Sequence, residues 1–107
     1  MSDTWDKIKE LIAKRDIRIS EHGYDELAAD NLTVREILEG SPDGIVIEEY
    51  PEYSKGPCIL IMFKDKEGHS IHAVWGIPYE SPSPAVLVTA YRPDPERWAD
   101  GLRRIKK

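Results

Sequence analysis

Apolar residues recur every three or four positions along the first forty residues, with charged residues between them. Near the N-terminus this pattern comprises Trp5, Ile8, Leu11 and Ile12. The spacing is typical of amphipathic helices, because it places the apolar side chains on one helical face. Further along, Ser20 is a favourable N-cap. Thr33 and Glu36 have the spacing of a capping box, and Gly40 is a natural stop. The pattern predicts three short helices, over residues 3–15, 20–31 and 33–40.

From residue 44 onward the pattern changes to short segments rich in β-branched and aromatic residues, with turn-forming residues between them. These segments predict four strands, over residues 44–50, 58–64, 70–77 and 85–92. The connection Asp65-Lys66-Glu67-Gly68 suits a hairpin whose last turn residue is a glycine with a positive φ. Because the links between the segments are short, we predict an antiparallel meander of four strands.

The end of the chain predicts a further helix. Asp94 is a typical N-cap, and Pro95 follows it at the first helical position. Apolar residues then recur at helical spacing, at Trp98, Leu102 and Ile105. The predicted fold is therefore α+β, with N-terminal helices and a C-terminal helix packed on a four-stranded antiparallel sheet. A chain of 107 residues has material for one hydrophobic core. We expect a single domain, 1–107, with a helical part, a sheet and a last helix at residues 1–40, 43–92 and 94–106.

Composition excludes several classes of protein. With 40% hydrophobic residues the chain is not disordered as a whole, and no apolar stretch reaches the length of a membrane-spanning helix. The N-terminus lacks the pattern of a secretory signal, so we expect a cytoplasmic protein with no membrane partner. The single cysteine, Cys58, has no partner for an internal disulfide and is expected to be reduced and buried.

The net charge of −5 counts against a protein that binds nucleic-acid backbones, and we expect no DNA binding by the chain on its own. The charge is uneven, however. Residues 1–56 carry fourteen acidic and seven basic side chains, whereas residues 57–107 carry six and eight. The acidity therefore belongs to the first half, and the objection to nucleic-acid binding is weaker for the second half.

Alternation along a strand assigns side chains to the two faces of a sheet. In the predicted strand 70–77, His72 lies opposite the larger apolar set, which is Ile71, Ala73, Trp75 and Ile77. In the strand 85–92, the two faces carry Val86, Val88 and Ala90, and Leu87, Thr89 and Tyr91. If the helices cover the bulkier sets, His72, Thr89 and Tyr91 lie together on the second face. Such a cluster of proton-handling side chains is a candidate site.

Each of these residues also has an ordinary structural interpretation. A histidine in a strand is often a half-buried cross-strand partner, Thr89 is an ordinary strand residue, and Tyr91 can cover the core with its ring. His22, near the start of the second predicted helix, can pair with Asp25 or Glu26 one turn later. Together, His72, Thr89 and Tyr91 are a stronger candidate site than any one of them alone, because strand alternation groups them without regard to their chemistry.

Four segments carry a resemblance to a known group: Ile19-Ser20-Glu21-His22, Glu48-Glu49-Tyr50-Pro51, Ser70-Ile71-His72, and the run from Val88 to Trp98. At these residues the chain resembles an uncharacterised bacterial and archaeal domain family of the RelE/ParE-like toxin superfamily. The resemblance covers residues 18–107. It implies a barnase/RelE-type fold and action as a ribosome-dependent or free mRNA endoribonuclease. Members of the family are often encoded beside a YgiT-type zinc-finger antitoxin, and the group typified by the MqsR toxin has the same kind of partner. The resemblance therefore also implies a small antitoxin partner.

The implied activity assigns roles to the candidate residues. Metal-independent RNA cleavage needs a base for the ribose 2′-hydroxyl, an acid for the departing 5′-oxygen, and groups that stabilise the charged phosphorane. His22 and His72 are the predicted acid and base, because both protonation states of histidine are accessible near neutral pH. Thr89 and Tyr91 are predicted to donate hydrogen bonds to the phosphate or to orient a histidine.

Two cations, Arg92 and Lys64, are predicted to bind the substrate. Because Arg92 follows Tyr91 in the strand, its side chain starts on the opposite face and reaches the site only if the strand bulges or ends there. No metal or cofactor is predicted, since the chain has no H-E-x-x-H motif or similar metal-ligand spacing. The expected partners are the antitoxin and mRNA or the ribosome.

Two other functions stay open as alternatives. The acidic balance and three tyrosines, Tyr50, Tyr53 and Tyr79, are compatible with a non-catalytic protein-interaction module of the same fold. A further alternative is a hydrolase or isomerase that acts on a small ligand at the same histidine face.

Overall fold

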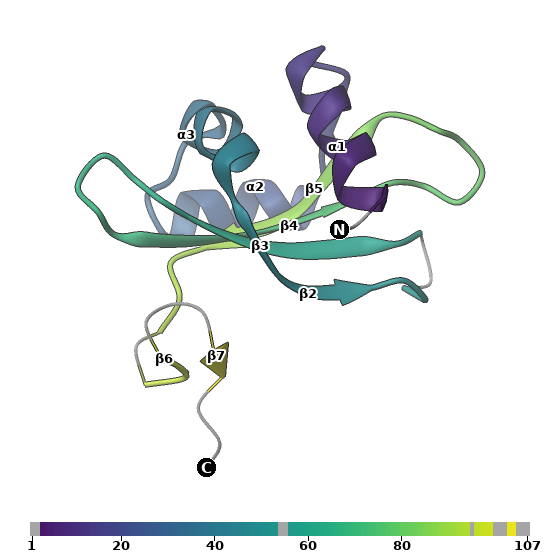
Figure 1. The fold of residues 1–107 in the computed structure, drawn as a ribbon. Helices are drawn as coiled ribbons and strands as arrows, with labels where there is room; N and C mark the ends of the chain where they lie inside the picture. Colours follow the sequence, from purple (N-terminus) through teal and green to yellow (C-terminus); the bar gives the residue numbers. More distant parts are fainter. Residues whose placement is uncertain (1–2, 54–55, 95, 100–102, 105–107) are drawn as a thin grey trace.

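Three helices and seven strands make up the part of the chain that the structure, a computed structural model, describes: residues 3–53, 56–94, 96–99 and 103–104. The helices are α1 (Asp3–Ala13), α2 (Glu21–Ala29) and α3 (Val34–Gly40), and a 3₁₀ turn follows at Ser41–Asp43. The strands are β1 (Ile17–Ile19), β2 (Ile45–Tyr50), β3 (Cys58–Lys64), β4 (Ser70–Gly76), β5 (Ala85–Tyr91), β6 (Trp98–Ala99) and β7 (Arg103–Arg104). The helices lie on one side of the main sheet, and the β6–β7 pair lies on the other (Figure 1).

The three predicted helices are confirmed, and their caps explain where they begin. The hydroxyl of Ser20 accepts a hydrogen bond from the backbone N–H of Gly23 at 2.9 Å, which caps α2. Thr33 and Glu36 form the expected reciprocal capping box at the start of α3. The first helix is two residues shorter than predicted, because Arg15 adopts a positive φ of 61° just beyond its end.

The main sheet differs from the prediction of four antiparallel strands. It has five strands in the order β1-β5-β4-β3-β2. Strands β2 to β5 form the predicted antiparallel meander, but β1 pairs with β5 in parallel, with Ile17 opposite Ala85. The sheet is therefore mixed, and the prediction of a wholly antiparallel sheet was wrong. A run of three residues between two helices is too short for alternation to identify it as a strand.

The predicted C-terminal helix is wrong for the residues that are described there, because they form strands β6 and β7. Asp94 does act as a cap. Its carboxylate accepts from the backbone N–H of Glu96 at 2.8 Å, and its carbonyl accepts from that of Trp98 at 3.0 Å. The chain makes this single turn and then enters β6. Three residues on which the prediction also rested lie outside the described part of the chain: Pro95, Leu102 and Ile105.

The main hydrophobic core lies between the helices and the sheet. Its largest fully buried side chains come from α1, α3, β3, β4 and β5: Ile8, Ile12, Ile37, Ile59, Ile61, Ile71, Trp75 and Leu87. The indole N–H of Trp75 donates to the hydroxyl of Ser41 at 3.0 Å, and both side chains are fully buried. At Gly40 a Cβ would lie 2.2 Å from the ring of Phe63, so α3 needs a glycine there to approach β3. No helix in the described residues is long and apolar enough to span a bilayer.

A β-bulge in β5 changes which of its side chains face the helices. Thr89 pairs with Val74 and Leu87 pairs with Trp75, so Val88 is the extra residue between them. Leu87 therefore faces the helices beside Trp75 and is 1% exposed, although simple alternation placed it with Thr89. Thr89 stays on the face away from the helices, and so does Tyr91, which lies opposite His72. The three candidate residues share one face, as alternation predicted.

Replacement of Ser41 by alanine tests the polar contact inside the core. The Ser41→Ala variant leaves the buried indole N–H of Trp75 without its acceptor, so we expect a loss of about 1–3 kcal/mol in the free energy of unfolding. Urea denaturation followed by far-UV circular dichroism measures it. Ser81→Ala is the matched control, because among the described residues the Ser81 hydroxyl bonds only to the backbone of Ser83, two residues away. An equal loss in both variants would show that the indole contact has no special importance.

Candidate functional site

The strand pairing places His72 in a buried aromatic cluster on the sheet face away from the helices. His72 is 0% exposed. Its Nδ1 lies 3.3 Å from the hydroxyl oxygen of Tyr91, and the two rings meet edge to face with centroids 5.3 Å apart. The ring of Trp98, from β6, lies edge-on to the imidazole at 4.4 Å. Tyr91 thus orients the imidazole, and Trp98 covers it.

Thr89 adds an unpaired hydroxyl to the same face. It lies diagonally across from His72, because Thr89 pairs with Val74 and Tyr91 pairs with His72. Its Oγ1 is buried and has no hydrogen-bond partner in the described part of the chain. A buried polar group without a partner costs about 1–3 kcal/mol, and natural proteins retain such features mainly at functional sites.

A second polar pair lies on this face and was not among the predicted catalytic residues. Glu48 pairs with Leu60, which pairs with Val74, so Glu48 projects to the same side of the sheet as His72. Tyr50, two residues further along β2, donates a hydrogen bond to the Glu48 carboxylate. The spacing of Glu48 and Tyr50 along a strand indicated that the two side chains share a face of the sheet. The sequence did not indicate which face, because that depends on a bulge between Val46 and Glu48.

The structure places His22 away from His72. His22 lies in the first turn of α2, is 67% exposed at its side chain, and has its Nε2 3.6 Å from the carboxylate of Glu26. It lines a cavity of about 830 Å³ whose described lining does not include His72. Gly76, which lines that cavity, is four residues from His72 along β4, or about 13 Å at ~3.3 Å per residue. The geometry brings His72, Thr89 and Tyr91 together and leaves His22 in a separate cavity.

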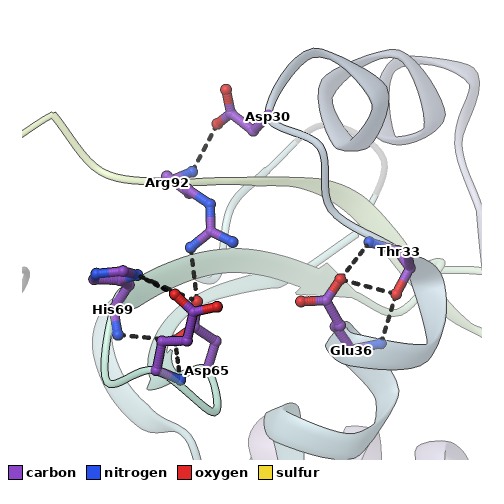
Figure 2. Close-up of polar contacts among 7 residues, drawn as sticks. Asp30, Thr33, Glu36, Asp65, His69 and Arg92 are labelled. Carbon is purple, nitrogen blue, oxygen red and sulfur yellow. Dashed lines mark hydrogen bonds and ion pairs between the residues drawn. The ribbon is translucent and has the colours of Figure 1, made fainter.

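Lys64 and Arg92 come together at a different cavity, of about 680 Å³, between α3 and the end of the sheet. Arg92 follows the last residue of β5 without a bulge, and its side chain turns toward the helices rather than toward His72. Its Nη1 donates to Oδ2 of Asp65 at 2.9 Å, and its backbone N–H donates to Asp30 at 2.7 Å (Figure 2). The two predicted substrate-binding cations therefore line one cavity at the end of the sheet, and the described lining of that cavity does not include His72.

Asp65 organises the turn beside this cavity. Its Oδ1 accepts the backbone N–H groups of Glu67 and His69, each at 2.9 Å, and its Oδ2 accepts from Arg92 (Figure 2). These contacts, the backbone N–H of His69 above all, hold the pKa of the Asp65 carboxyl below its ordinary value. Acidic side chains also line the cavity: Glu36, Glu39, Asp43, Asp65 and Glu67. Lys64 has no ion pair among the described residues, so its charge is available.

The single thiol of the chain is structural. Cys58 is 4% exposed, and burial raises the pKa of its thiol, so the thiol stays protonated near neutral pH. The expectation of a buried cysteine is confirmed. In the described ranges no three side chains among His, Cys, Asp and Glu gather closely enough to hold a metal ion.

Comparison with known proteins places the chain in a family. Residues 19–92 match the family model described as Domain of unknown function, DUF4258. The chain belongs to this family. The matched DUF4258 region includes both histidines of the predicted acid/base pair, as well as Thr89, Tyr91 and the cations Lys64 and Arg92. It ends before the segment that carries Trp98. No curated protein and no solved structure gives a significant match. The family description names no activity.

The ionisation of Asp65 gives a prediction on stability and pH. A carboxyl whose pKa is lower in the folded state stabilises the fold above its unfolded pKa of about 3.9, and this contribution is lost as the pH falls through the folded pKa. We expect Asp65→Asn to lower the melting temperature near neutral pH. The difference from the wild type should shrink as the pH approaches about 2. Asp43→Asn is the control, because Asp43 lines the same cavity without a hydrogen bond in the described residues. A difference that grows on acidification would contradict this role.

Proposed function

We propose that this DUF4258 protein is a toxin-type endoribonuclease that cleaves mRNA by metal-independent acid/base chemistry. The observation that carries the proposal is the contact of His72 with Tyr91, beside the unpaired hydroxyl of Thr89, on the sheet face that the helices leave uncovered. The resemblance to RelE/ParE-like toxins supports the same activity.

The groups on this face match the needs of RNA cleavage. His72 exchanges a proton with the ribose 2′-hydroxyl or with the departing 5′-oxygen, and Tyr91 fixes the orientation of its ring. The hydroxyl of Thr89 donates to the charged phosphorane. Glu48 lies on the same face as His72, so we propose this carboxylate as the second proton-transfer group in place of His22. Lys64 and Arg92, at the end of the sheet, contact the phosphates of the flanking RNA.

RNA reaches His72 only if Trp98 moves away from the imidazole, because His72 is fully buried. Trp98 belongs to a two-residue strand that pairs only with β7 in the described residues. Pairs of two short strands contribute little stability of their own. Displacement of this cover therefore costs much less than opening the five-stranded sheet. The partner that the resemblance implies, a small zinc-finger antitoxin, would keep the enzyme inactive until it is removed.

A non-catalytic interaction module is the second candidate. The complete burial of His72 under Trp98 favours it, as do three exposed tyrosines: Tyr24, Tyr53 and Tyr79. Tyr50, the other tyrosine that the sequence offered for an interaction surface, is half-buried and bonded to Glu48. A stable protein partner, together with absence of cleavage after its removal, would support this second function.

Substitution of His72 tests the enzyme proposal. With the purified chain and RNA, with and without ribosomes, we expect cleavage by the wild type and a roughly 10²–10⁴-fold lower rate for His72→Asn. His69→Asn is the control, since His69 is 66% exposed in the β3–β4 turn and should leave the rate unchanged. Gel electrophoresis of end-labelled RNA measures the rates.

His72 is buried, so its substitution can also disturb the fold. Tyr91→Phe keeps the ring and removes only the hydroxyl that contacts His72. We expect it to reduce cleavage and to lower the free energy of unfolding by about 1–3 kcal/mol, because a buried polar group loses a partner. Urea denaturation shows whether the variant is folded under the conditions of the cleavage assay. If the wild type cleaves no RNA under either condition, or if folded His72→Asn protein cleaves at the normal rate, the proposal fails.

Thr89 allows stability and activity to be separated. Thr89→Val removes a buried hydroxyl that has no hydrogen-bond partner among the described residues, so we expect the free energy of unfolding to rise by about 1 kcal/mol. We expect cleavage to fall at the same time, because the phosphorane loses a donor. Thr89→Ser retains the hydroxyl and should retain most of the activity. Urea denaturation and RNA cleavage are measured on the same samples. A Thr89→Val protein that is as active as the wild type would exclude a role for the hydroxyl.

A further inference from the structure

The cavity that His22 lines has the composition of a site for a small organic ligand. Its volume of about 830 Å³ lies within the usual range for such sites. Its floor is apolar and comes from β3, β4, β5 and the residues that follow β4: Cys58, Gly76, Ile77, Pro78, Val86 and Val88. Polar and aromatic side chains from β1, α2 and the β2–β3 connection also line it: Arg18, Glu21, His22 and Tyr53.

The rim groups are those that recognise a nucleotide. Tyr53 is 43% exposed and offers a flat ring on which any of the nucleobases can stack. Arg18 is exposed and has no ion pair in the described part of the chain, so its guanidinium is available to a phosphate. The imidazole of His22, which is 67% exposed, lines the same cavity. An apolar floor with an aromatic ring and a guanidinium at the rim favours a planar ligand with one anionic group.

The charge of the cavity limits how anionic the ligand can be. Arg18 is its one fixed cation among the described lining residues, and Glu21 is a carboxylate of the same lining. Glu26 lies next to His22. These carboxylates would repel the several negative charges of a triphosphate. A phosphodiester carries only one negative charge for each nucleotide and would be repelled less. The balance therefore favours one nucleotide within an RNA strand over a free nucleoside triphosphate.

We propose that this cavity binds one nucleotide of single-stranded RNA, with the base against Tyr53 and the apolar floor and the phosphate against Arg18 and His22. The inference rests on the proposed function, because that nucleotide belongs to the RNA that the His72 face cleaves. The cavity and the His72 face lie at different points along β4, so the cavity holds a nucleotide away from the cleaved bond. His22 is thereby a substrate-binding residue.

Binding of mononucleotides to the full chain tests the site without any need for cleavage. Nuclear magnetic resonance titration with adenosine 5′-monophosphate should shift signals of the lining residues. Tyr53→Ala should weaken this binding about 10-fold, a change that corresponds to ~1.4 kcal/mol and lies within the range for base stacking. Tyr24→Ala is the matched control, because Tyr24 is 58% exposed but does not line the cavity. Arg18→Gln should weaken the monophosphate and leave adenosine unaffected.

The outcomes separate this inference from the proposed enzyme activity. If the monophosphate binds and Tyr53→Ala weakens it, while the chain cleaves no RNA, the nucleotide site stands and the endoribonuclease proposal fails. If the chain cleaves RNA but Tyr53→Ala changes neither mononucleotide binding nor the KM for RNA, the nucleotide site is wrong and the enzyme proposal stands. Equal weakening by Tyr53→Ala and Tyr24→Ala, or equal binding of phenyl phosphate and adenosine monophosphate, would also overturn the site.

Discussion

The pairing of β4 with β5, including the bulge at Val88, determines both faces of the sheet. One extra residue in β5 turns Leu87 toward the helices, where it packs beside Trp75, and leaves Thr89 on the other face. A regular β5 would put Leu87 and Thr89 on the same face, so that either the core would lose a leucine or it would gain a hydroxyl. The hydrophobic core and the His72 face are thus two consequences of one local irregularity.

This pairing also places His72 against Tyr91, and Trp98 of β6 covers the imidazole, which is fully buried. A buried imidazole needs polar or aromatic partners, and Tyr91 and Trp98 supply them on two sides. Rigid orientation favours acid/base chemistry, whereas the cover by Trp98 opposes it. Orientation of the imidazole and access to it are compatible, because the residue that orients it and the residue that covers it belong to elements of different stability. Tyr91 belongs to the five-stranded sheet, and Trp98 belongs to the small β6–β7 pair on its far side (Figure 1).

The sequence predicted the features that local chemistry determines. Ser20 and Thr33 cap the helices where expected, because an N-cap hydrogen bond closes within three residues. Features that depend on distant partners were missed or wrong. Strand β1 exists only by pairing with β5, and the cap at Asp94 yields one turn before Trp98 enters β6. In the site, alternation grouped His72 with its neighbours on β5. It carried no information on where the helix residue His22 would lie relative to the sheet.

The layered arrangement also changes what the net charge of −5 means. Of the fourteen acidic residues within residues 1–56, eight lie in α1, α2 and α3, on one side of the sheet (Figure 1). Packed layers are separated by about 10 Å, which is close to the Debye length of ~8 Å at physiological ionic strength. The exposed helix carboxylates therefore repel an anion on the opposite face less than an anion on their own side of the sheet. That face carries the carboxylate of Glu48, and the pairing of Lys64 with Ser70 puts one cation on it at the end of β3, so it is not strongly basic. RNA recognition there would depend on stacking and hydrogen bonding more than on charge.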